Sequence, residues 1–173
     1  RNTGLRAAKG DLIAFLDDDD LFLQGKLTKQ VAYLCEHPEF DAVYCHARRG
    51  NHVASTAVIE GDGSRDILLL QSNFFTPSLM FRRESLESIY GFDESFRRHQ
   101  DYELLLRFFA AGYKMGCVPE VLIKIGLNQG ENIPTGEKVN QLKAYFFEKF
   151  QSFIDKENEK TPGFANKVYA KHY

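Results

Sequence analysis

The sequence contains few cysteines, no large excess of either charge and no long apolar run. A net charge of −2 over 173 residues gives no basic field for nucleic acid or anionic lipid, so we exclude a nucleic-acid partner. No apolar run approaches the roughly 20 residues that span a bilayer, so we predict no transmembrane segment. The cysteines, Cys35, Cys45 and Cys117, lie far apart and outside any CxxC pair. This excludes a disulfide framework and a zinc site, and we expect reduced core thiols in a cytosolic protein.

The first ten residues, RNTGLRAAKG, have neither an initiator Met nor a signal peptide. Leu5 and Ala8 already show helical spacing, and Gly10 is a typical helix stop. The sequence therefore starts inside a secondary-structure element. We expect it to be a fragment, with a segment missing before Arg1.

The residue pattern predicts one α/β domain with a helical tail. A helix that ends near Lys9 is followed by the apolar DLIAFL at 11–16, an order typical of a βαβ unit and therefore of a parallel sheet. Further helices are expected over 24–36, 65–71, 82–89 and 101–113, and from 137 onward. Further strands are expected over 41–47, 52–59, 78–82 and 114–125, the last being one strand or two split at Pro119.

Four consecutive carboxylates, Asp17 to Asp20, follow the apolar strand. The end of such a strand is where open α/β sheets bind ligands. Carboxylates this close repel one another, and Mg²⁺ or Mn²⁺ would neutralise them with oxygen ligands. Asp17 and Asp19 would point to the same side, whereas Asp20 could cap the next helix. The competing interpretation is an exposed acidic loop that holds no metal.

Three segments resemble the family 2 glycosyltransferases of GT-A fold: RNTGLRAAKGDLIAFLDDDDLF at 1–22, SLMFRRE at 78–84 and GFDESFRRHQDYELLLRF at 91–108. The resemblance implies a mixed, mainly parallel sheet flanked by helices, incomplete at the N-terminus, with a C-terminal helix. It divides the chain into a partial GT-A domain at 1–127, a flexible loop at 128–136 and a helical extension at 137–173. Members commonly build bacterial surface polysaccharides, which implies a cytoplasmic protein, free or at the inner face of the membrane.

The resemblance also implies an activity, namely transfer of a sugar with inversion from a nucleotide-diphosphate sugar to a hydroxyl of a glycan or lipid-linked acceptor. Mg²⁺ or Mn²⁺ would hold the donor diphosphate. The implied residues are Asp19 as metal ligand, Asp101 as general base, Asp17, Asp18, Arg1 and Asn2 toward the donor, and His99 and Gln100 toward the acceptor.

The sequence departs from the family at Gln100, where Glu is common, and at Leu21-Phe22, where Trp is common. The family's first strands are also missing, which implies that the fragment alone is inactive and does not bind the donor normally. Its sheet would then have an exposed edge or be completed by a second copy. Asp101 could instead cap a helix, which would lower its pKa and weaken it as a base. Two other hypotheses stay open: a catalytically silent sugar-binding or oligomerisation module, and a phosphoryl-transfer enzyme that uses the acidic cluster.

Overall fold

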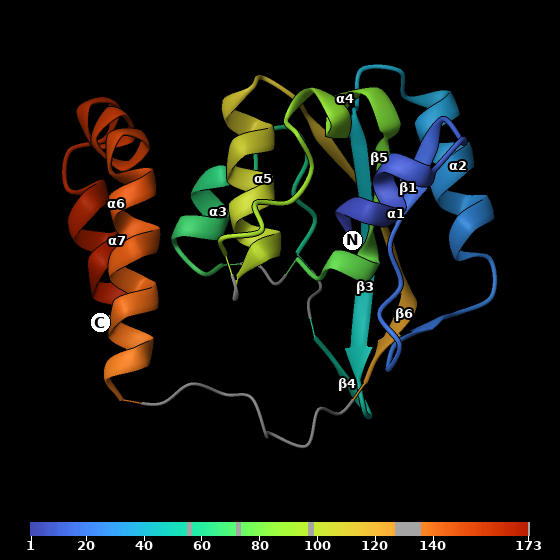
Figure 1. Ribbon diagram of the computed structural model, residues 1–173, viewed down its shortest axis with the longest axis horizontal. Coiled ribbons are helices and arrows are strands. Elements are labelled where there is room, and N and C mark those ends of the chain that lie inside the picture. The colour runs from blue at the N-terminus through green and yellow to red at the C-terminus, as the bar shows by residue number, and fades with distance from the viewer. Residues whose placement is uncertain (55–56, 72–73, 97–98, 127–135, 173) are drawn as a thin grey trace.

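The computed structural model describes residues 1–54, 57–71, 74–96, 99–126 and 136–172. At its centre is a six-stranded sheet in the order β1-β5-β3-β6-β2, with β4 beside β3 (Figure 1). The strands are Leu12–Ala14 (β1), Leu21–Phe22 (β2), Ala42–Arg49 (β3), His52–Val53 (β4), Leu79–Arg82 (β5) and Met115–Ile125 (β6).

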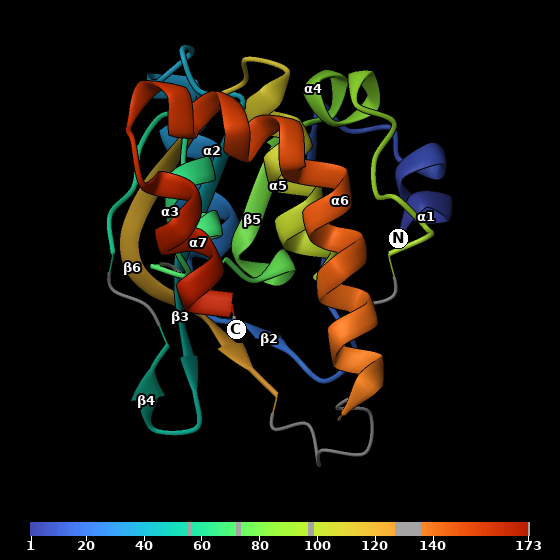
Figure 2. The ribbon, with the colours of Figure 1, turned by 90° about the vertical axis from the view of Figure 1, so that its left-hand side faces the viewer.

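Helices cover both faces of the sheet. The α-helices are Asn2–Ala7 (α1), Lys26–Glu36 (α2), Ser64–Leu68 (α3), Arg83–Ser88 (α4), Gln100–Ala110 (α5), Glu137–Lys160 (α6) and Phe164–His172 (α7), and Thr76–Ser78 is a 3₁₀ helix. Figure 1 shows α2 on one face and α3 with α5 on the other, and Figure 2 shows α6 and α7 lying outside α3 and α5. None of the helices in the described ranges is long and apolar enough to cross a membrane.

The two faces of the sheet bury two cores, because side chains alternate along each strand. On β3, Ala42 and Tyr44 join the larger core under α5, while Val43, Cys45 and Ala47 join the smaller core under α2. The strand is therefore apolar at nearly every position, which is why its sequence reads as a continuous run.

The predicted α/β fold with a mixed sheet is confirmed, but it contains fewer parallel pairs than expected. Among the described strands only β3 and β6 pair in parallel, while β1–β5, β5–β3, β3–β4 and β2–β6 are antiparallel. Two of these antiparallel pairs arise because β5 lies between β1 and β3 and runs against both. The βαβ interpretation of the first helix and β1 predicted a parallel neighbour for β1. Among the described strands β1 pairs only with β5, and that pair is antiparallel.

Most predicted elements are found, with changes at their ends. The expected strand at 52–59 is reduced to β4, and residues 55–56 lie outside the described part. The strand at 114–125 is not split, because shifts in its register with β3 accommodate Pro119. The tail forms two helices rather than one, and nearly all of the expected loop at 128–136 lies outside the described ranges. Cys45 and Cys117 are buried thiols as predicted, but Cys35 is exposed.

A fully buried carboxylate fastens the helical tail to the domain. Glu103 on α5 has no exposed surface. Its two oxygens accept hydrogen bonds from Arg107 at 2.6 and 2.7 Å, and Lys149 of α6 lies 2.9 Å away. Arg107 also donates to the carbonyl oxygens of Ile89 and Gly91. Glu103 and Arg107, which are four residues apart on α5, therefore belong to a larger ionic cluster that includes Lys149.

We predict that Glu103→Ala lowers the free energy of unfolding by about 3 kcal/mol, because it leaves the charges of Arg107 and Lys149 without their shared partner. Denaturant unfolding followed by circular dichroism measures this loss. Glu159→Ala, at an exposed position of α6, is the control and should change the free energy by less than about 0.5 kcal/mol. Equal effects of the two substitutions would show that the cluster gives no net stability.

Candidate functional site

The acidic segment forms a tight turn at the edge of the sheet. The N–H of Asp20 donates to the carbonyl oxygen of Asp17 at 3.1 Å, and β2 then pairs with the end of β6. Gly126, just after β6, lies directly against this turn. A Cβ atom at Gly126 would come within 2.7 Å of Oδ2 of Asp19 and closer still to its carbonyl oxygen. The turn can therefore occupy this place only because residue 126 has no side chain.

Asp20 fastens the turn to β6. Its Oδ1 accepts the N–H of Gly126 at 2.8 Å. The prediction that Asp20 caps the next helix is therefore wrong, since α2 begins after Gly25 without a side-chain cap. Burial is the main reason that the pKa of Asp20 is raised, and the charges of Asp19 and Asp17 add to that effect against the bond from Gly126.

Arg1 connects the acidic turn to the start of α5. Its guanidinium donates to both carboxylate oxygens of Asp17, at 2.9 and 2.7 Å, and to Oε1 of Gln100 at 3.2 Å. It also lies over the ring of Phe92, 5.2 Å from the ring centroid. One cation thus holds together two segments that are far apart in the sequence.

These contacts enclose a cavity of about 280 Å³ that carries four carboxylates. Six of the eight residues that the resemblance implied line it, namely Arg1, Asp17, Asp19, His99, Gln100 and Asp101. The same cavity is lined by further residues that sequence reasoning did not assign to it: Asp20, Arg49, Phe75, Thr76, Pro77 and Ile125. Arg49 ends β3 at this edge of the sheet, and its position after an apolar strand was the one signal that could have indicated it.

Asp18 and Asn2 do not line this cavity. Asp18 lines a separate hollow beside α1 and β1. The amide of Asn2 donates to the carbonyl oxygen of Phe92 at 2.7 Å and to Glu94 at 2.9 Å, and its oxygen accepts the N–H of Phe92. A Cβ at Gly91 would collide with it. In this structure Asn2 therefore holds the turn before α5.

Burial dominates the electrostatics of Asp101. The residue is half-buried, and desolvation of its carboxyl raises its pKa to about 6. The N–H of Tyr102 donates to its Oδ1 at 3.0 Å and lowers the pKa, as expected for a bond at the helix start, and Arg1 acts in the same direction. Desolvation outweighs both effects, so the net shift of the pKa is upward. A carboxyl with a pKa near 6 is ionised at neutral pH and is a stronger base than an exposed aspartate.

His99 precedes α5 in a left-handed conformation, with φ of 56°. This conformation is uncommon for a residue with a side chain and is found at functional sites more often than elsewhere. Its ring stacks on that of Tyr102, with the centroids 5.5 Å apart. The backbone of His99 therefore departs from right-handed helical geometry directly before α5 begins.

The donors in this cavity fit a divalent cation held together with a phosphorylated ligand. In the described residues no group of three or more His, Cys, Asp or Glu side chains is arranged to hold a metal by itself. Mg²⁺ and Mn²⁺ need only one or two carboxylates when phosphate oxygens complete their shell. Asp17 and Asp20 are engaged by Arg1 and Gly126, whereas Asp19 is exposed and makes no hydrogen bond or ion pair within the described chain. Asp19 is the carboxylate best placed to bind a cation.

Comparison with known proteins gives consistent matches. The model of "Glycosyl transferase family 2" matches residues 1–105. An uncharacterised glycosyltransferase of Methanocaldococcus jannaschii is 29% identical over 156 residues, which are 84% of this chain and 52% of that protein. The amylovoran biosynthesis glycosyltransferase AmsE of Erwinia amylovora is 25% identical over 131 residues, which are 72% of this chain and 48% of that protein.

Two solved structures share the fold. Residues 1–349 of S. aureus TarS, in complex with UDP-GlcNAc, superpose with a TM-score of 0.62 at 16% identity, over 84% of this chain and 45% of that one. The mannosyltransferase PcManGT from Pyrobaculum calidifontis, in complex with GDP-Man and Mn²⁺, gives 0.56 at 21% identity, over 99% of this chain and 47% of that one. The chain thus spans about half the length of these relatives.

The charges around Asp101 predict how its titration responds to substitution. Asp17 raises the pKa of Asp101 and Arg1 lowers it. We therefore expect Asp17→Asn to shift the midpoint below 6 and Arg1→Gln to shift it above 6. The side-chain carboxyl ¹³C resonance of Asp101, followed from pH 3 to pH 8, measures both shifts. A midpoint near 4 in the unsubstituted chain would contradict the upward shift of the Asp101 pKa that we attribute to burial.

Proposed function

The chain belongs to glycosyl transferase family 2, and on that basis we propose that it transfers a sugar, with inversion, from a nucleoside-diphosphate sugar to an acceptor hydroxyl. One observation carries the proposal. A single cavity brings the acidic turn and Asp101 together, so the exposed carboxylate of Asp19 and a carboxyl of raised pKa face the same space. A divalent cation beside the leaving group and a base beside the nucleophile suffice for single displacement.

In this proposal Asp19 binds the divalent metal and the donor lies along the turn. A diphosphate would be repelled by the carboxylates of the cavity, and Mg²⁺ or Mn²⁺, when bound, offsets this charge and stabilises the negative charge that develops on the leaving group. The complexes of TarS with UDP-GlcNAc and of PcManGT with GDP-Man and Mn²⁺ support a donor of this class. Asp17, which Arg1 orients, is the second carboxylate on this side.

Asp101 takes the proton of the acceptor hydroxyl as that oxygen attacks the anomeric carbon. Its enclosed position favours this role, because a base with a pKa near 6 accepts a proton readily and is still ionised at pH 7. Gln100 and His99 border the same cavity and would contact the acceptor. Since Gln100 is neutral and already receives a bond from Arg1, it orients the acceptor without adding negative charge.

Calorimetry with Mn²⁺ and UDP or GDP tests the donor side, on this chain and on the longest natural polypeptide that contains it. We expect nucleotide binding that requires Mn²⁺ and weakens by about tenfold or more in Asp19→Ala. The control is Asp11→Ala, which removes a carboxylate with a fully exposed side chain outside the cavity. Asp18→Ala is expected to resemble this control, because Asp18 lines another hollow.

The catalytic side is tested by Mn²⁺-stimulated hydrolysis of the donor by the longer polypeptide. Asp101→Asn should retain nucleotide binding and lose about 10²-fold or more in turnover. Nucleotide binding without any turnover in the unsubstituted protein would favour the silent sugar-binding module. Phosphatase activity that is independent of Asp101 would favour phosphoryl transfer, and the absence of metal-dependent binding in both forms would refute the proposal.

A further inference from the structure

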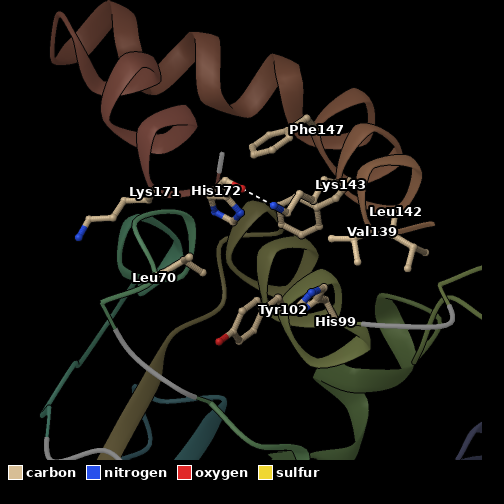
Figure 3. Close-up of a pocket in the computed structure, with 10 residues that line it drawn as sticks. Leu70, His99, Tyr102, Val139, Leu142, Lys143, Phe147, Lys171 and His172 are labelled. Carbon is tan, nitrogen blue, oxygen red and sulfur yellow. Dashed lines mark hydrogen bonds between the residues drawn. The ribbon is translucent and has the colours of Figure 1, made fainter. Parts of the chain in front are cut away.

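A second cavity, of about 370 Å³, lies between the helical tail and the start of α5 (Figure 3). Its walls come from α6, from the end of α7, from α5 and from Leu70, which follows α3. The volume is at the lower end of the roughly 300–1,000 Å³ range of small-molecule sites, so the cavity fits part of a ligand rather than a large one.

The second cavity adjoins the acidic one. His99 lines both, and the residues after it divide between them: Gln100 and Asp101 face the acidic cavity, whereas Tyr102 faces the second. Figure 3 shows the rings of His99 and Tyr102 side by side below the helical tail, with the Tyr102 hydroxyl directed away from it. His99 therefore forms a wall common to both cavities at the place where they adjoin.

Backbone strain marks the same place. Three non-glycine residues of the described chain have positive φ, and two of them, Leu70 and His99, line this cavity. Leu70 is also 44% exposed, which is unusual for a leucine held in an unfavourable conformation. Such strain persists only where the surrounding structure imposes it, and it is enriched at ligand sites. Both strained residues present a side chain to the second cavity.

The chemistry of the walls is apolar and aromatic. Tyr102, Phe146 and Phe147 supply rings, Val139 and Leu142 supply aliphatic groups, and no Asp or Glu is among the described residues that line the cavity. Four basic residues, His99, Lys143, Lys171 and His172, complete the lining. Lys143 donates to the carbonyl oxygen of His172 and so closes one end, and burial lowers the pKa of His172, which favours its neutral form.

We propose that this cavity binds the hydrocarbon part of an amphiphilic acceptor whose hydroxyl-bearing head lies beside Asp101. The inference rests on the proposed transferase function and adds the class of acceptor to it. The contrast between the two cavities argues for one molecule with two ends, because a polar head fits the carboxylate-lined space and a hydrocarbon fits the ring-lined one. Because His99 lines both cavities, the head and the hydrocarbon of the ligand join beside His99 in this proposal.

The test uses n-octyl β-D-glucoside, below its micelle-forming concentration, with methyl β-D-glucoside as the probe that has the same head and no chain. We expect the octyl compound to bind this chain about tenfold or more tightly than the methyl compound. Leu142→Glu should weaken octyl glucoside binding by about fivefold or more, because it places a charge against the hydrocarbon. Ala144→Glu is the matched control, since it adds the same charge at an exposed position of α6 outside the cavity.

Two further readouts keep the test decisive. Leu142→Ala, a milder change, should weaken octyl binding in the same direction if Leu142→Glu does not fold. Saturation with octyl glucoside should shift the ring-proton resonances of His99 and the carboxyl ¹³C resonance of Asp101, and Mn²⁺-dependent UDP or GDP binding should be unchanged in every variant.

Equal affinity for the two glucosides, or equal loss in Leu142→Glu and Ala144→Glu, would overturn the proposal. So would tight octyl binding that leaves Asp101 unshifted, because the cavity would then hold a hydrocarbon that has no connection with the acceptor position. Loss of metal-dependent nucleotide binding in the unsubstituted chain and in its longer natural form would instead count against the transferase function itself. The two failures are therefore separate.

Discussion

Repulsion between carboxylates is the constraint on which this structure depends. Asp17, Asp19, Asp20 and Asp101 face one small cavity, although Asp101 comes from a distant part of the chain. The fold compensates three of them: Arg1 pairs with Asp17, the N–H of Gly126 bonds to Asp20, and Asp101 gains proton affinity. Within the described residues Asp19 has no such compensation, which leaves one carboxylate available to a cation.

The same constraint fixes the elements around the cavity. The acidic turn can rest on the end of β6 only because Gly126 lacks a side chain, and Arg1 then sets the distance between that turn and α5. On the far side of α5, Glu103 is a second buried charge that Arg107 and Lys149 neutralise. Helix α5 thus begins with residues that line the acidic cavity and contacts the tail along its side, so one element connects the cavity to the tail.

The sequence predicted what depends on local pattern and failed where distant contacts decide. Helical spacing and the apolar runs located α2, α5 and most strands. Of the eight site residues that the family resemblance implied, six line one cavity. The direction of β5 and the contact of Asn2 with Phe92 were not predicted, because each depends on partners far along the chain. The bond at the start of α5 does lower the pKa of Asp101, but the larger effect of burial could not be read from the sequence.

The two cavities take their walls from different parts of the chain. The family pattern ends at residue 105, and the acidic cavity is built mostly from segments before it. The second cavity takes most of its wall from α6 and α7, which lie after that limit. Substitutions in α6 and α7 can therefore reshape the second cavity while the residues around Asp101 stay unchanged. Lys149 limits such changes, because its contact with Glu103 joins α6 to α5.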